Sequence, residues 1–207
     1  MTLPVANPFS TQFTRPGAVP FLYPTGLSRE TLIERLAAAN WQAQILGQHG
    51  AGKTTLALDL LEALSQHFDR ILRITVRQPS VLKLAIDQSV ELDRGERSGR
   101  LLILIDGVER LAHFHRWALK RVCQRKGIGL LATVHRQTGW LPTIATLETE
   151  FNTFERIANQ LLVGSETFLS PTVFRQEFEN AKGNCREAFM GLYDRFEAAA
   201  PVQACAV

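Results

Sequence analysis

The sequence predicts a three-layer α/β/α fold, in which helices cover both faces of a parallel β-sheet, followed by a small C-terminal helical lid. Strand-like apolar runs alternate with helical segments between residues 28 and 150, a pattern typical of parallel sheets. The run Leu101–Ile105 is apolar at every position, as expected for an interior strand buried on both faces. From Phe151 onward the apolar residues recur at helical spacing alone.

Composition agrees with a globular protein that has a sizeable core. The chain has 207 residues, of which 45% are hydrophobic and 21% charged, enough for one large domain or a core with an appendage. We expect no membrane segment and no signal peptide, because no apolar run is long enough. Three scattered cysteines (Cys123, Cys185 and Cys205) lack metal-binding spacing and predict a reducing, cytoplasmic setting. A net charge of +3 does not by itself imply a nucleic-acid partner.

The first 27 residues are predicted to form a separate extended arm. Prolines and aromatic residues alternate here; the prolines disfavour a helix, whereas the aromatic rings favour burial. We therefore expect the arm to lie along the folded body, with a disordered terminus as the alternative.

The predicted core spans residues 28–150. Ser28 is the expected N-cap of a helix over 29–40. The elements that follow are predicted at 41–46 (strand), 56–64 (helix), 71–76 (strand), 81–92 (helix), 101–106 (strand), 108–126 (helix), 128–134 (strand) and 143–149 (a weaker strand).

The lid is predicted over residues 151–197, with a tail at 198–207. Its first helix follows the apolar spacing from Phe151. Ser170 precedes a proline, which suits the N-cap and first position of a second helix. Asn184, with Glu187 three residues later, predicts the start of the last helix.

A glycine-rich loop is the strongest functional signal in the chain. The run Gly47-Gln48-His49-Gly50-Ala51-Gly52-Lys53-Thr54 matches G-x-x-x-x-G-K-[ST], in which backbone N–H groups cradle phosphates. Lys53 would reach the β- and γ-phosphates, and Thr54 would ligate Mg²⁺. Together with Thr55, these residues are the predicted contacts to ATP; the alternative is an ordinary glycine turn before a helix.

Asp106 is the second signal. An aspartate at the carboxyl end of a buried strand downstream of such a loop is suited to assist Thr54 at Mg²⁺; the alternative is an aspartate that starts a turn. One strand-like segment lies in sequence between the loop strand and the Asp106 strand. This order resembles the P-loop ATPases with an inserted central strand and a separate catalytic glutamate. No Asn-Lys-x-Asp run supports guanine binding.

Two further residues are candidates for catalysis. Gly107 follows Asp106 where many relatives have glutamate, so Glu109 is the nearest carboxylate that could position the attacking water. Thr133, at the end of the next strand, is expected beside Asp106. Each also has an alternative, purely structural interpretation. Glu109 would be favourable in the first turn of a helix, and Thr133 would be favoured in a strand by its β-propensity.

Arg186 lies in the predicted first turn of the last helix, where its charge opposes the helix dipole. The run Gly183-Asn184-Cys185-Arg186-Glu187 resembles the second sensor of the AAA+ ATPases. The resemblance, which also includes the loop, Asp106 and the Thr133 strand, implies that Arg186 reaches over the γ-phosphate. A solvated surface arginine is the alternative.

The segment 110–147 contains seven Lys or Arg residues, three His and no Asp or Glu. The predicted outward face of its helix shows Arg116, Lys120, Arg121 and Arg125, and the inward face Leu111, Phe114, Ala118 and Val122. Such a face could bind nucleic acid or an acidic protein, or supply an arginine in trans. A solvated helix face is the alternative.

Taken together, the motifs predict an ATPase that couples Mg²⁺–ATP binding and hydrolysis to a conformational change. A different interpretation is an ATP-dependent binding module with little turnover that docks on DNA or a protein. A small-molecule kinase is a third, which the strand order disfavours.

Overall fold

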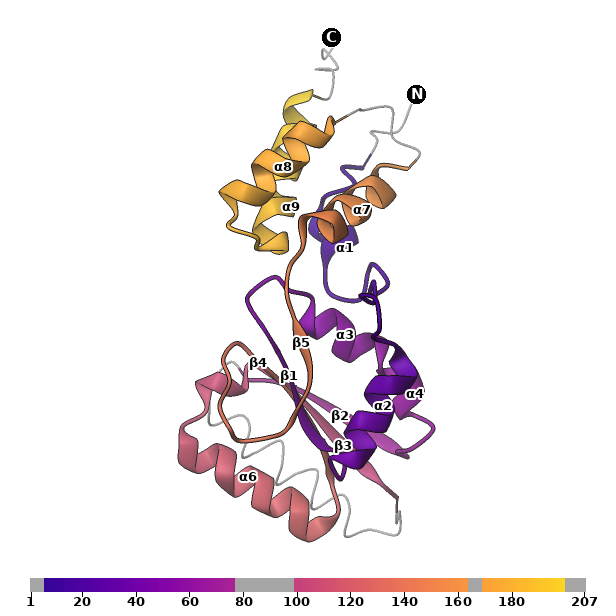
Figure 1. Cartoon of the computed structure of the whole chain (residues 1–207), viewed down its shortest axis with the longest axis vertical. Helices are drawn as coiled ribbons and strands as arrows, with labels where there is room; N and C mark the ends of the chain where they lie inside the picture. Colours follow the sequence, from indigo (N-terminus) through magenta and orange to yellow (C-terminus); the bar gives the residue numbers. More distant parts are fainter. Residues whose placement is uncertain (1–5, 77–98, 164–168, 200–207) are drawn as a thin grey trace, which may run out of the picture. The chain divides into compact units, whose positions relative to one another are not determined.

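The computed structural model describes residues 6–76, 99–163 and 169–199 (Figure 1). The helix predicted at 81–92 and most of the predicted tail lie outside these residues. The chain divides into two compact units. The core unit holds Tyr23–Gly47 and Lys53–Leu147, and the helical unit is built from residues of 1–22, 48–52 and 148–207.

The core unit contains a five-stranded parallel sheet, as predicted. Its strands are β1 (Gln42–Gly47), β2 (Arg70–Thr75), β3 (Leu101–Asp106), β4 (Gly129–Val134) and β5 (Thr143–Leu147). They are arranged in the order β2-β3-β4-β1-β5. Strand β4 therefore lies between the loop strand β1 and the Asp106 strand β3, which is the arrangement expected from the sequence.

Helices cover both faces of this sheet (Figure 1). Helices α2 (Arg29–Ala38), α3 (Lys53–Asp59) and α4 (Leu61–Leu64) lie on one face, and α6 (His113–Lys126) lies on the other. All but the last residue of β3 and all six residues of β4 are buried, which explains why their sequences are almost wholly apolar. These findings establish the three-layer α/β/α fold.

The helices on the α3 face differ little from prediction. The Oγ of Ser28 accepts a hydrogen bond from the backbone N–H of Thr31 at 3.2 Å, so Ser28 caps α2 as expected. The single helix predicted at 56–64 begins three residues earlier, at Lys53, and is divided near Leu60 into α3 and α4.

The prediction of a helix at 108–126 is wrong about where this helix begins. Gly107 has φ +81°, in the left-handed region that favours glycine, and only the short 3-10 helix η1 (Val108–Arg110) follows it. Leu111 and Ala112 are extended, and α6 begins at His113. Glu109 therefore belongs to a 3-10 turn rather than to the first turn of α6.

Two residues of α6 lie on the opposite face from that predicted, whereas Arg121 and Arg125 are exposed as predicted. The buried residues of α6 are Arg116, Leu119 and Cys123, and Arg116 is only 7% exposed. Phe114, predicted to point inward, is 72% exposed. The prediction failed because it included Leu111, which precedes the helix, in the helical periodicity.

The helical unit consists of α1 (Thr11–Thr14), α7 (Phe151–Leu162), α8 (Pro171–Asn180) and α9 (Cys185–Ala199). The three C-terminal helices agree with the predicted helical segment, although the side chain of Ser170 makes no capping hydrogen bond. The one-turn helix α1 corrects the expectation that prolines exclude helix from the arm, since it fits between Pro8 and Pro16.

Part of the arm is built into the core of the helical unit. Phe9 is 2% exposed and its ring stacks on Phe189 with centroids 6.3 Å apart. The Nδ2 of Asn7 donates to the backbone carbonyl of Tyr193 at 3.0 Å and to Glu197 Oε1 at 2.8 Å. Within the described residues, no helix is long and apolar enough to cross a membrane.

Candidate nucleotide-binding site

The glycine-rich loop connects a strand to a helix, as its motif requires. β1 ends at Gly47 and α3 begins at Lys53. Gly50 and Gly52, within the connection, have φ +77° and +79°, values that other residues adopt only with strain. The remaining predicted contacts are Gln48, His49 and Ala51 in the loop and Thr54 and Thr55 in the first turn of α3.

Lys53 is a buried cation, with 6% of its surface exposed. Its Nζ donates to the backbone carbonyl of Gly47 at 2.8 Å and lies 3.0 Å from His135 Nδ1. Burial lowers the pKa of Lys53 below its ordinary value, and the nearby charges of Asp106 and Glu109 oppose this shift. A phosphate group beside Nζ would act in the same direction as the two carboxylates, because anions favour the charged ammonium.

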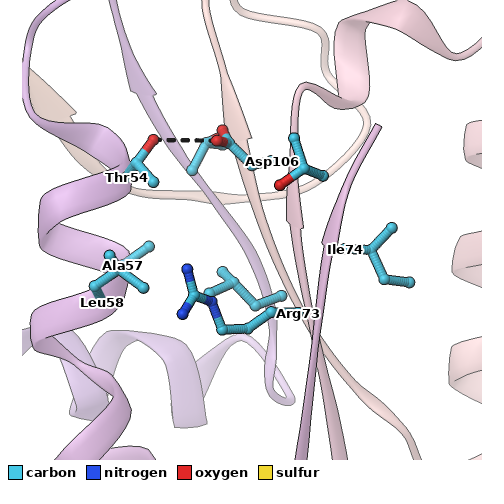
Figure 2. Close-up of a pocket in the computed structure, with 9 residues that line it drawn as sticks. Thr54, Ala57, Leu58, Arg73, Ile74 and Asp106 are labelled. Carbon is cyan, nitrogen blue, oxygen red and sulfur yellow. Dashed lines mark hydrogen bonds between the residues drawn. The ribbon is translucent and has the colours of Figure 1, made fainter. Parts of the chain in front are cut away.

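Asp106 accepts hydrogen bonds from two threonines on neighbouring elements. Thr54 Oγ1 donates to Asp106 Oδ2 at 3.2 Å, a contact drawn in Figure 2. Thr133 Oγ1, from the adjacent strand β4, donates to Asp106 Oδ1. The expectation that Thr133 lies beside Asp106 is therefore met.

A hollow of about 260 Å³ lies beside these three groups. Arg73 reaches from β2 toward Leu58 of α3 along its wall (Figure 2). The adjoining hydroxyl and carboxylate oxygens of Thr54 and Asp106 are the hard ligands that Mg²⁺ prefers. The residues present therefore fit a magnesium ion, held directly by Thr54 and supported by Asp106.

His135 connects Lys53 to Glu109. Its Nδ1 lies 3.0 Å from Lys53 Nζ, and its Nε2 lies 3.1 Å from Glu109 Oε1. The sequence places His135 just beyond the strand of Thr133, but nothing in its spacing indicates this bridge. The bridge forms because the fold brings η1 and the end of β4 together. The imidazole then holds Glu109 near the buried lysine.

The last candidate, Arg186, belongs to the helical unit. Asn184 caps α9 as predicted: its Oδ1 accepts from the backbone N–H of Arg186 at 3.1 Å, and its Nδ2 donates to Glu187 Oε1 at 2.8 Å. Residues 48–52 cluster with this same unit. A Cβ added at Gly50 would lie 2.8 Å from the backbone nitrogen of Cys185, so the loop glycine has to be free of a side chain where it meets the start of α9.

The fold of this chain also occurs in solved structures of other proteins. No protein-family model and no curated protein sequence matches the chain. Among solved structures, Drosophila ORC bound to DNA is similar over 90% of this chain and 63% of that chain, at 14% identity and a TM-score of 0.50. C. elegans PCH-2 is similar over 86% of this chain and 71% of that chain, at 14% identity and a TM-score of 0.52. Both are AAA+ ATPases.

The chain shares its three-layer α/β/α fold with these two structures. At 14% identity the likeness concerns the fold alone, and the chain spans less than two thirds of the ORC chain. In this fold, the loop at 47–54, Asp106 on β3 and Thr133 on β4 occupy neighbouring ends of β1, β3 and β4. Arg186 lies at the start of α9, in the C-terminal helices.

Proposed function

We propose that the chain is an ATPase that binds Mg²⁺–ATP through residues 47–55 and couples binding and hydrolysis to a conformational change. One observation carries the proposal: Lys53 and Thr54, Asp106 and Thr133, from three separate places in the chain, converge at the carboxyl edge of the sheet. A buried ammonium, two hydroxyls and a carboxylate suit a triphosphate with its metal better than they suit a structural role.

Each residue has a distinct part in this proposal. The Nζ of Lys53 would exchange its contacts with Gly47 and His135 for the β- and γ-phosphate oxygens. Thr54 would hold the metal with the support of Asp106. Bound Mg²⁺ supplies charge neutralisation on the phosphate oxygens. Thr133, which donates to Asp106, keeps that carboxylate in one orientation.

Glu109 is the proposed acceptor of the proton from the attacking water. The water oxygen would bond to the γ-phosphorus as the bond to the β–γ bridging oxygen breaks, which yields ADP and phosphate. His135 holds Glu109 Oε1 at 3.1 Å and also contacts Lys53. Movement of Lys53 onto the phosphates would therefore alter the contacts of the imidazole and, through it, those of Glu109.

The second candidate function is ATP-dependent docking on a partner with little turnover. Two observations favour it: glycine follows Asp106, and Glu109 is engaged by His135. The similar ORC structure is bound to DNA, so DNA is one partner to test. In both candidates we propose that Arg186 contacts the γ-phosphate and that the C-terminal helices respond to its presence.

The two candidates differ in the behaviour of Glu109→Gln. For an ATPase, we expect phosphate release to fall at least tenfold in this variant, while calorimetry shows unchanged ATP affinity. Glu62→Gln is the matched control, because Glu62 is an exposed carboxylate of the same unit, with 82% of its side chain accessible. Binding without measurable turnover in the wild-type protein would favour the docking module instead.

A further inference from the structure

Helix α6 displays two aromatic rings to solvent and buries an arginine beside Leu119 and Cys123. Phe114 is 72% and Trp117 is 54% exposed, whereas Arg116 is 7% exposed. Exposed aromatic side chains and a buried charge are each uncommon, and large exposed apolar surfaces mark interaction sites. Such a break with local rules indicates a function for this surface.

A hollow of about 370 Å³ opens between these residues. It is lined by His113, Phe114, Arg116, Trp117, Thr138 and Trp140. Its size falls at the lower end of the range for ligand sites, roughly 300–1,000 Å³. Trp140 is held in the wall because its Nε1 donates to the backbone carbonyl of Arg116 at 2.8 Å. The hollow is thus a fixed feature with aromatic walls.

One nitrogen of the arginine in this wall has no hydrogen-bond partner. Among the residues that the structure describes, the Nε of Arg116 is the buried side-chain nitrogen or oxygen without a partner. Leaving a buried donor unpaired is unfavourable, and the segment 110–147 contains no carboxylate that could pair with it. An anionic ligand in the hollow, whose lining includes Arg116, would balance the charge of this guanidinium.

Further cations lie along the same helix. The guanidinium of Arg121 stacks over the Trp117 ring, with 4.6 Å between Cζ and the ring centroid. Arg125 and Lys126 are exposed in the last turn. Rings and positive charges are therefore combined on one helix, over its whole length from His113 to Lys126.

We propose that this surface, defined by Phe114, Arg116, Trp117, Arg121 and Arg125, binds single-stranded nucleic acid. Unstacked bases would lie on the rings of Phe114 and Trp117, and the phosphates would pair with the arginines. Charge and shape favour this ligand over an acidic peptide. An acidic peptide would satisfy the cations but offer the rings of Phe114 and Trp117 no base to stack on, whereas each nucleotide brings a ring and an anion together.

This inference does not depend on ATP binding, and it is tested without nucleotide. Fluorescence anisotropy of a 5′-fluorescein dT20 oligonucleotide is measured against the full chain at low salt. We expect Phe114→Ala with Trp117→Ala to raise Kd at least about tenfold, since base stacking on each ring contributes substantially. Arg121→Gln is expected to reduce the slope of log Kd against log salt by about 0.7, as for one lost phosphate contact.

Two variants in the helical unit are matched controls. Met190 is 61% exposed, so Met190→Ala removes an exposed apolar side chain elsewhere. Arg175 stacks on Phe151 at 4.1 Å, so Arg175→Gln removes an arginine in a similar setting. Neither control is expected to change Kd. Because Phe114, Trp117 and Arg121 are exposed, their replacement leaves folding intact, which thermal unfolding verifies.

The proposal is overturned if the double variant binds dT20 as tightly as the wild type. It is also overturned if polyglutamate competes more strongly than unlabelled dT20, which indicates an acidic protein partner, or if sedimentation shows that these rings join two copies of the chain. Lys53→Ala should retain oligonucleotide binding. This result would show that the surface on α6 acts independently of the proposed ATP site. The nucleic-acid proposal and the ATP proposal can therefore be refuted separately.

Discussion

Replacement of Asp106 by asparagine separates the proposed role of this residue in Mg²⁺–ATP binding from its role in the fold. The side chain keeps its size but loses its charge. In the structure the carboxylate accepts hydrogen bonds from Thr54 and Thr133. An asparagine can still accept from one hydroxyl and donate to the other, because hydroxyl groups serve as both donors and acceptors.

The cost to the fold follows from these two contacts. Hydrogen bonds to a charged group contribute about 1.5–3 kcal/mol and neutral ones about 0.5–1.5 kcal/mol. Two such exchanges therefore lower the free energy of unfolding by about 2 kcal/mol, which leaves a folded protein to assay. The substitution also removes one of the carboxylates that oppose the lowered pKa of Lys53, so the pKa of this lysine falls further.

The cost to ligand binding is expected to be of similar size but, unlike the cost to the fold, to depend on Mg²⁺. Loss of a group that supports a metal ligand lowers metal affinity about 10- to 100-fold, equivalent to about 1.4–2.8 kcal/mol. Calorimetric titration with ATP, with and without Mg²⁺, measures this difference. Asp59→Asn is the matched control, because Asp59 also pairs with two side chains in the core unit, Tyr23 and Arg29. If Asp106→Asn retains the full stimulation of ATP binding by Mg²⁺, the metal site has been assigned to the wrong residues.

Three further predictions concern the remaining candidate residues. The pKa of Lys53 is lowered in the folded protein, so its charge destabilises the fold below the folded pKa and this penalty disappears as the pH rises toward the unfolded value. The stability of Lys53→Met relative to the wild type should consequently fall as the pH rises, and a pH-independent difference in chemical denaturation would contradict this. His135→Gln should lower turnover only while Glu109 is present, which a double-mutant cycle with Glu109→Gln measures; additive losses would show that the bridge is not functional. Arg186→Ala should reduce the preference for ATP over ADP by about 10- to 150-fold, corresponding to a charge-assisted contact of about 1.5–3 kcal/mol, while sparing stability. Unchanged discrimination with lost stability would make Arg186 a structural residue.

The strands could be predicted because their signals are local. Runs such as Leu101–Ile105 are apolar throughout, and the motif at 47–54 is a run of consecutive residues that can be read directly from the sequence. The position of Asp106 at the end of its strand then placed it beside Thr54 and Thr133, since the carboxyl ends of parallel strands meet at one edge.

The faces of α6 and the role of His135 could not be predicted, because they depend on tertiary structure. Gly107 turns the chain in the left-handed region, which delays the helix to His113, and within that helix Arg116 is buried and Phe114 is exposed, contrary to prediction. Spacing alone does not reveal where a helix starts within a continuous polar and apolar pattern. The contact of His135 with both Lys53 and Glu109 requires η1, α3 and β4 to be in place.

The measurement that tests the account most directly is the titration of the full chain with Mg²⁺–ATP by calorimetry, compared with Lys53→Ala. Lys53 provides the cation of the loop, so its loss leaves the phosphate charge without its closest proposed partner. The account predicts saturable binding of one ATP per chain in the wild type and loss of most affinity in the folded variant. Equal binding by the two proteins, or no binding by the wild type, would contradict the assignment of residues 47–55 as a nucleotide site.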